Sequence, residues 1–186
     1  MKRIAVLLLF LLFFGCAKQA QPELIVYGSV PNFSLTDRDG NTITLQDLAG
    51  KVWIADFIFT NCAGTCPVIT DQMHKLQEAL PKEISMVSFT VDPSRDTPEV
   101  LAEYARKHNA QENRWFFLTG EKDTLYNLSV KGFKLALDDT GGTEVEPITH
   151  STRLVLVDQR GQIRGYYGGT DDEDMKRLSA DAKRLL

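Results

Sequence analysis

Two cysteines separated by three residues are the part of the sequence best suited to chemistry. Cys62 and Cys66 stand between the apolar run 52–59 and a segment with helical spacing that begins at Pro67. Proline is favoured in the first turn of a helix, so we expect Cys66 at or near a helix N-terminus. The helix dipole and the free N–H groups favour the thiolate form there. A pair of such thiols can exchange electrons as a dithiol and disulfide, or bind a soft metal ion.

The alternative for this pair is a disulfide that only stabilises the fold. Export would permit such a bond, but the loop from Cys62 to Cys66 is short. Closing a loop of this size stabilises a protein by only about 2 kcal/mol before any strain is subtracted. The pair is also expected beyond the carboxyl end of a strand, where open α/β sheets bind their ligands. We therefore interpret both cysteines as redox and metal-binding candidates.

Three histidines are candidates for a further ligand. His74 lies eight residues beyond Cys66, a rise of about 12 Å along a helix, so it cannot reach the sulfur atoms. His108 ends a predicted helix and is expected to have a structural role there. His150 stands between the polar segment 138–149 and an apolar strand, and spacing alone leaves its role as a ligand open.

Asp92 follows a second apolar run, 84–91, and is expected at the same sheet edge as the cysteines. One interpretation is that it tunes the thiols or supports the metal ligands through hydrogen bonds. The other is that it accepts hydrogen bonds in the turn before Pro93. Asp96 and Thr97 are expected to cap the helix that begins with Pro98.

The first sixteen residues have the pattern of a secretory signal. Lys2 and Arg3 are followed by the segment 4–14, which has no polar side-chain atom and is too short for a bilayer span of about 20 residues. Cys16 after a glycine resembles the lipobox of bacterial lipoproteins, where the cysteine is acylated. The alternatives are an uncleaved anchor or a plain signal peptide. We expect residues 17–30 to tether an exported domain, 31–186, that faces the periplasm or another extracytoplasmic space.

The pattern of the remaining chain predicts an α/β fold. Alternating segments flank Asp39 and Gly40, which is typical of a hairpin. Buried strands are predicted at 52–59 and 84–91, with the helix 67–80 between them. Further strands are expected at 115–118, 135–137, 152–157 and 162–167, and further helices at 97–108, 123–130 and 171–186. This order suits a thioredoxin-like sandwich with an extra N-terminal β-hairpin. The net charge of -4 argues against nucleic-acid binding.

Three segments together resemble the Sco/SenC family of thioredoxin-like copper-binding proteins. They are FTNCAGTCP (59–67), VDPSRDTPEVLAEYA (91–105) and THSTRLVLVDQRGQIRGYY (149–167), in the family's order. The resemblance implies that Cys62, Cys66 and His150 bind copper, as Cu(I) and also Cu(II). One residue departs from the family pattern: Ala63 stands where a proline is common, which leaves copper affinity and redox potential open.

The resemblance also implies a role for the chain. A membrane-tethered member of this family would deliver copper to the dinuclear centre of cytochrome c oxidase subunit II or a related copper oxidase, and would exchange copper with other carriers. The main alternative is a thiol–disulfide oxidoreductase that reduces the metal-binding cysteines of the target. A peroxidase is a third possibility, which the cysteine pair and the late histidine disfavour. Whether the chain is an enzyme at all stays open at this point.

Overall fold

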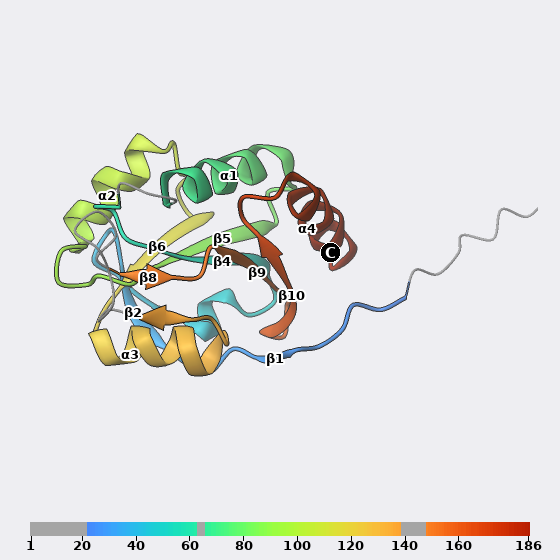
Figure 1. Cartoon of the computed structure of the whole chain (residues 1–186), viewed down its shortest axis with the longest axis horizontal. Coiled ribbons are helices and arrows are strands. Elements are labelled where there is room, and N and C mark those ends of the chain that lie inside the picture. Colours follow the sequence, from blue (N-terminus) through green and yellow to red (C-terminus); the bar gives the residue numbers. More distant parts are fainter. Residues whose placement is uncertain (1–21, 63–65, 139–147) are drawn as a thin grey trace, which may run out of the picture.

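A mixed sheet with helices on both faces forms the body of the molecule (Figure 1). The computed structural model describes residues 22–62, 66–138 and 148–186. Its strands are β1 (Gly28–Ser29), β2 (Ser34–Asp37), β3 (Thr42–Thr44), β4 (Val52–Ile58), β5 (Ile84–Thr90), β6 (Trp115–Thr119), β7 (Leu137–Asp138), β8 (Thr149–His150), β9 (Arg153–Val157) and β10 (Gln162–Gly168). Its helices are α1 (Cys66–Ala79), α2 (Pro98–Lys107), α3 (Lys122–Asn127) and α4 (Asp172–Arg184), with short turns η1 (Leu45–Leu48) and η2 (Leu128–Gly132). In these ranges no helix is both long and apolar enough to cross a membrane.

The strand order in the main sheet is β1-β10-β9-β4-β5-β6-β2-β3, and β7 and β8 form a separate small ribbon. The neighbours β4, β5 and β6 are parallel, and the other pairs in the main sheet are antiparallel. Every residue of β4 and β5 is buried, as the two continuous apolar runs predicted. The predicted α/β, thioredoxin-like order with an N-terminal hairpin is confirmed.

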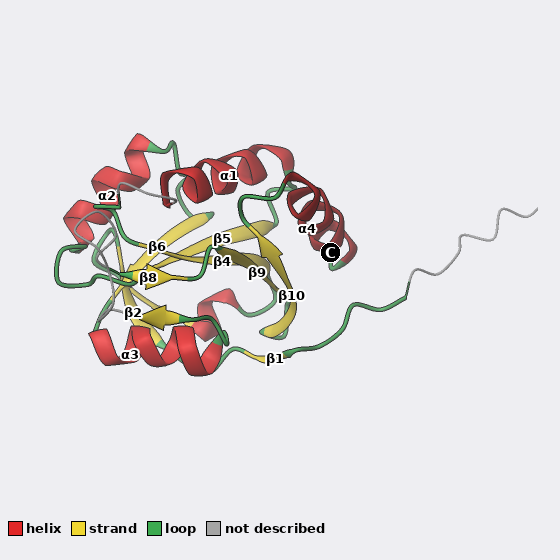
Figure 2. Ribbon diagram, viewed as in Figure 1, coloured by secondary structure: helices red, strands yellow, loops and turns green. Residues whose placement is uncertain are grey.

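Side chains of β4 point alternately into two apolar cores, one on each face of the sheet. Trp53 and Phe57 lie in one core with residues of α3, η2 and the hairpin β2–β3. Ile54 and Ile58 lie in the other core with residues of α1, α2 and α4. Figure 2 shows the same division, with α1, α2 and α4 above the sheet and α3 below it. The sheet is therefore covered on both sides and its central strands are rigidly held.

Local sequence explains the two predicted hairpins. Asp37 accepts hydrogen bonds from the backbone N–H groups of Asp39 and Asn41 at 2.9 and 2.8 Å, and Gly40 has a φ of 83°. These are turn features, because a carboxylate can replace a backbone acceptor and glycine tolerates positive φ. The hairpin β9–β10 closes in the same way across Asp158 and Gly161.

The segment 22–30 differs from a free tether. Gly28 and Ser29 pair with Ile163 and Gln162 at the edge of the sheet. The backbone N–H of Tyr27 donates to Ile163, and that of Val30 donates to Gly161, both at 2.9 Å. No local pattern predicts this strand, because its two ladder residues are a serine and a glycine, and glycine is depleted in strands. This part of the expected tether packs against the domain.

Candidate metal and thiol site

The two cysteines lie where the central strand β4 gives way to helix α1. Cys62 follows the end of β4 by four residues, carries a free thiol and is only 9% exposed. Cys66 is the first residue of α1, as the proline after it predicted. Both cysteines therefore lie at the carboxyl end of the parallel strands, the edge at which ligands bind in such sheets.

His150 reaches this edge from the far end of the chain. It lies in β8, opposite Leu137 of β7. Its ring packs edge-on against the ring of Phe59, with 5.7 Å between the centroids. Its Nδ1 lies 3.1 Å from the carbonyl oxygen of Ser151. In the tautomer with the proton on Nδ1, that nitrogen donates to Ser151 and the ring lone pair is on Nε2, the form in which a histidine binds a metal.

Phe59 connects His150 with Cys62: its ring contacts the ring of His150, and it belongs to the same apolar cluster as Cys62. Cys62 is the third residue after Phe59, a reach of at most about 11 Å along the chain. Phe59 and Cys62 belong to one apolar cluster, and Leu137 and Ile148 from the ribbon pack against it. In Figure 1, β8 lies at the same end of the molecule as the start of α1. The chemistry of a thiol, a second cysteine and an imidazole at one edge fits a soft metal ion.

The described side chains alone do not complete a metal site. No three of the His, Cys, Asp and Glu side chains that the structure describes are arranged to hold a metal ion. The side chain of Cys66 is not among them. Ala63 and Cys16, and residues 139–147 of the predicted polar loop 138–149, also fall outside the described residues.

Asp92 lies at the end of β5 and is 7% exposed. Its Oδ1 accepts from the hydroxyl of Ser94 at 2.6 Å, and its Oδ2 pairs with the guanidinium of Arg95 at 3.0 Å. Its carbonyl oxygen accepts from the N–H groups of Arg95 and Asp96. These bonds are what a turn acceptor makes, and they order the loop that carries Asp96.

Asp96 connects the cysteine loop to the neighbouring strand. Thr97 alone caps α2, whereas the carboxylate of Asp96 turns inward and is 1% exposed. It accepts from the hydroxyl of Thr60 and from the hydroxyl of Thr90, each at 2.5 Å, and from the N–H of Thr60 at 3.2 Å. Burial raises the pKa of Asp96, and the hydrogen bonds from the threonines oppose that rise. Since Thr60 lies two residues before Cys62, these bonds fix where the cysteine loop begins.

The expectation that Asp96 caps the helix is therefore wrong, and its inward role was missed. An aspartate directly before Thr97 and Pro98 can either cap the helix or accept hydrogen bonds from the protein interior, and the local sequence does not distinguish the two roles. The side chain turns inward because Thr60 and Thr90, at the ends of two adjacent parallel strands, both present hydroxyl donors. That meeting depends on the pairing of β4 with β5, which no local pattern reveals.

The other two histidines lie on helix α1 and at the end of helix α2. His74 is on α1, beyond its second turn. His108 is the C-cap of α2, where its ring lies 4.5 Å from that of Tyr104 and its Nδ1 lies 3.6 Å from Asp71. Burial lowers the pKa of His108, although Asp71 acts in the opposite direction. Its contacts at the helix end are consistent with the structural role expected of it.

The comparisons with known proteins agree with the fold. The model of the SCO1/SenC family matches residues 26–186. A SCO1/SenC family lipoprotein from Bacillus anthracis is 35% identical, with a TM-score of 0.77 over 85% of this chain and 95% of that one.

Two further solved structures are similar. One is BsSco, described as a member of the Sco family of cytochrome c oxidase assembly proteins with a disulfide switch; it is 30% identical, with a TM-score of 0.74 over 89% of this chain and 100% of that one. The other is yeast Sco1 with copper bound, which is 27% identical, with a TM-score of 0.69 over 89% and 91% of the two chains. The match of the family model to most of the chain, together with these structures, shows that the chain belongs to the SCO1/SenC family.

Proposed function

We propose that this protein binds copper and supplies it during the assembly of cytochrome c oxidase. The observation that carries the proposal is the packing of the His150 ring against Phe59, three residues before Cys62. That contact places the imidazole of His150 at the sheet edge where the segment 62–66 begins with one cysteine and ends with the other. The similarity to yeast Sco1 with copper bound and to BsSco supports the same role.

Copper is the cargo, and its ligands in this proposal are Cys62, Cys66 and His150. Cu(I) is a soft ion that prefers thiolate sulfur and accepts imidazole nitrogen, whereas structural zinc sites normally have four ligands. Low coordination lets a target replace one ligand at a time. Oxidation of the two thiolates to a disulfide would remove both sulfur ligands and release the ion. Asp92 supports the ligands indirectly in this proposal. Its carbonyl oxygen orders the loop that carries Asp96, and Asp96 in turn binds Thr60 near Cys62.

The place of action is part of the proposal. Acylation of Cys16 would anchor the exported domain to the membrane that contains the oxidase, and the similarity to a lipoprotein of the family supports this. The target would be the dinuclear copper centre of subunit II, with other copper carriers as donors. An anchored carrier gains effective concentration near a membrane target.

A titration of the reduced protein with Cu(I) tests the metal site. We expect His150→Ala to lower the affinity for Cu(I) by about tenfold or more, because one of three ligands is lost and each 1.4 kcal/mol is a factor of ten. The matched control is His74→Ala, which removes a histidine of α1 and should leave the affinity unchanged. Equal affinity of His150→Ala and the parent would exclude His150 from the site.

Thiol–disulfide exchange is the second candidate function, favoured by the free thiol of Cys62 and by the helix start at Cys66. In that reaction a cysteine thiolate attacks a disulfide of the target, and the other cysteine resolves the mixed disulfide. Reductase activity that survives in His150→Ala and disappears in Cys62→Ser or Cys66→Ser would favour exchange over copper transfer.

A further inference from the structure

Three consecutive apolar residues are exposed on the segment that leads into the domain. Ile25, Val26 and Tyr27 are 66%, 46% and 54% exposed. Single apolar side chains on a surface need no explanation, but a contiguous group indicates an interaction site. Lys131 and Lys134 line the same pocket as Tyr27. We call these two lysines and the three apolar residues the strap surface.

The strap surface is held rigidly to the fold. Arg164 sits at a register shift in β10 and donates to the carbonyl oxygen of Leu24 at 2.5 Å. The N–H of Tyr27 donates to Ile163, and the Tyr27 ring packs edge-on against that of Tyr166 at 5.4 Å. The apolar side chains are therefore presented by an ordered edge of the sheet, with little entropy left to lose when they become buried.

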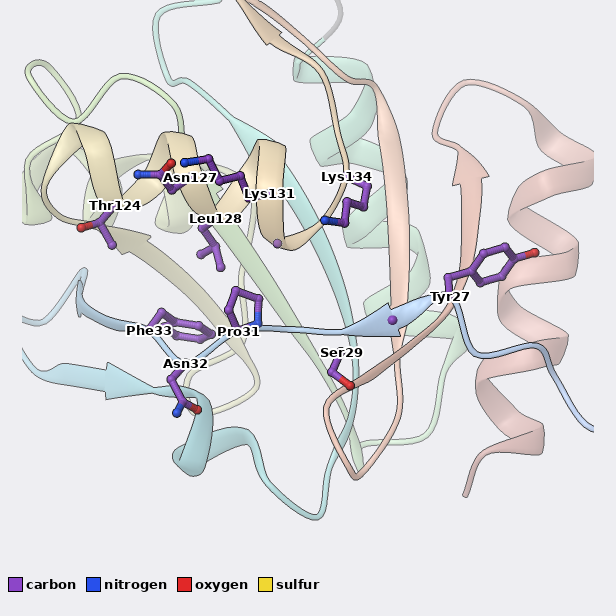
Figure 3. A pocket seen from close by; sticks show the side chains of 12 residues that line it. Tyr27, Ser29, Pro31, Asn32, Phe33, Thr124, Asn127, Leu128, Lys131 and Lys134 are labelled. Atoms are coloured by element: carbon purple, nitrogen blue, oxygen red, sulfur yellow. The ribbon is translucent and has the colours of Figure 1, made fainter.

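A basic pocket begins at Tyr27, the last of the three exposed apolar residues. It has a volume of about 620 Å³ and runs between the segment 27–33 and the helical segment 124–134. Figure 3 shows Lys131 and Lys134 on the helical side and Tyr27 at the far end. No aspartate or glutamate lines it, and in the described part of the chain neither lysine forms an ion pair. In a protein of net charge -4, such a place selects an anionic partner.

The short chain between Cys16 and the strap surface limits how far this surface can lie from the membrane. Ile25 is the ninth residue after Cys16, a span of at most about 32 Å. If Cys16 is acylated, as the proposed function holds, the strap surface is the part of the domain nearest along the chain to the lipid. Apolar side chains beside lysines, with a tyrosine at the boundary, are the composition that binds at a bilayer interface.

We propose that the strap surface docks on the membrane, with Ile25 and Val26 entering the interfacial region and Lys131 and Lys134 binding anionic lipid headgroups. This inference rests on the proposed anchoring through Cys16 and adds a second contact, made by the folded domain. This second contact fixes one orientation of the domain, and hence of the edge with Cys62 and His150, relative to a membrane target.

Fluorescence quenching in vesicles tests the docking. The full chain with Ile25→Trp would be reconstituted into vesicles that carry brominated acyl chains, made of phosphatidylcholine alone or with phosphatidylglycerol. The native Trp53 and Trp115 are 0% and 1% exposed, so the parent chain provides a low and constant background. We expect the new tryptophan to be quenched in the vesicles with phosphatidylglycerol, and less in phosphatidylcholine alone.

Charge reversal identifies the lysines involved. Lys131→Glu with Lys134→Glu should lower the docked fraction by about five-fold or more per lysine, because a basic side chain near an anionic surface contributes about 1 kcal/mol. The matched control is Lys75→Glu with Lys183→Glu, an exposed pair beside the groove between α1 and α4. The control should leave quenching unchanged, and all variants should bind Cu(I) like the parent.

Two outcomes would overturn the proposal. One is the absence of quenching in vesicles with phosphatidylglycerol, which would leave a protein partner as the occupant of the strap surface. The other is equal quenching of the reversed and control variants. The mass of the chain isolated from membranes shows separately whether Cys16 is acylated, and the Cu(I) titration tests the metal site. Failure of docking is therefore distinguishable from failure of the proposed function.

Discussion

Asp56 places a carboxyl group in the middle of the central strand β4. It is 1% exposed, and its Oδ1 accepts from the hydroxyl of Ser88 at 2.6 Å, which in turn accepts from the indole N–H of Trp115 at 2.9 Å. Its Oδ2 is buried without a partner among the described residues. Burial raises the pKa of Asp56 to about 7, and the bond from Ser88 opposes the rise. The folded protein therefore favours the protonated acid up to near-neutral pH.

Replacing Asp56 by asparagine should change how stability depends on pH. The folded pKa of Asp56 is about 7 and the ordinary value is 3.8. The stability associated with the protonated form is thus fully present below about pH 4 and lost as the pH rises through 7. At about 1.4 kcal/mol per pKa unit, the loss amounts to at most about 4 kcal/mol. Asp56→Asn is always neutral, so it should remove this loss.

Urea unfolding at pH 5 and pH 8 measures the effect. The free energy of unfolding should fall less between these values for Asp56→Asn than for the parent. Ser88→Ala is the control: it removes the hydrogen bond from Ser88 but keeps the carboxyl group, so the pH dependence should persist. An Asp56→Asn variant with the pH dependence of the parent would show that Asp56 ionises normally in the folded state.

At the scale of elements, Gly169 determines how closely the chain after β10 approaches α1. A Cβ there would lie 2.5 Å from Cδ1 of Ile69 and 2.7 Å from the carbonyl oxygen of Thr152. The N–H of Gly169 donates to that same oxygen at 3.0 Å. The absence of a side chain is therefore what lets the strand end, the loop before β9 and the first turns of α1 meet.

Gly169→Ala should destabilise the protein by about 1–3 kcal/mol, the usual cost of overpacking a filled interior. The midpoint of urea unfolding measures it. Gly168→Ala is a neighbouring control, because its new Cβ would stay 3.3 Å from Oδ2 of Asp174 and 3.6 Å from the Cβ of Asp171, with no contact below 3 Å. Similar midpoints for the two variants would mean that α1 and Thr152 move apart at little cost.

At the scale of the whole molecule, Arg164 ties the N-terminal segment 22–30, called the strap below, to the sheet. Its side chain is buried and pairs with the buried Asp158 at 2.8 Å while holding the carbonyl oxygen of Leu24. Arg184, near the C-terminus, also donates to the carbonyl oxygen of Pro22. The chain that leads to the proposed anchor is thus fixed to two late elements, β10 and α4.

Arg164→Met should have two effects. Asp158 would remain buried without its cationic partner, although it keeps the two backbone N–H groups of its turn; breaking a buried ion pair typically costs about 3–5 kcal/mol. The strap would also open more often, so amide hydrogen exchange at Tyr27 and Val30 should become faster. Arg184→Met, which removes only the contact to Pro22 and a pair with Asp181, is the milder comparison. Unchanged exchange in Arg164→Met would show that the β1–β10 ladder alone holds the strap.

The sequence by itself determined most elements and the position of the cysteine pair. Continuous apolar runs specify β4 and β5, helical spacing specifies α1 and α4, and Pro67 marks the helix start at Cys66. These features depend on the period of the backbone and on the fixed geometry of proline, which act over a few neighbouring residues. The roles of Cys62, Cys66 and His150 as copper ligands, which the family resemblance implied, remain a proposal.

Only the tertiary structure decided which distant groups meet. The ring of His150 packs on Phe59 across ninety residues of chain, and Asp96 joins Thr60 to Thr90. The strap pairs with β10 although its strand residues are Gly28 and Ser29. Such contacts depend on the order of strands in the sheet and on the path of the connections. Local preferences carry no information about either, because the free energy that selects them comes from burying the shared core.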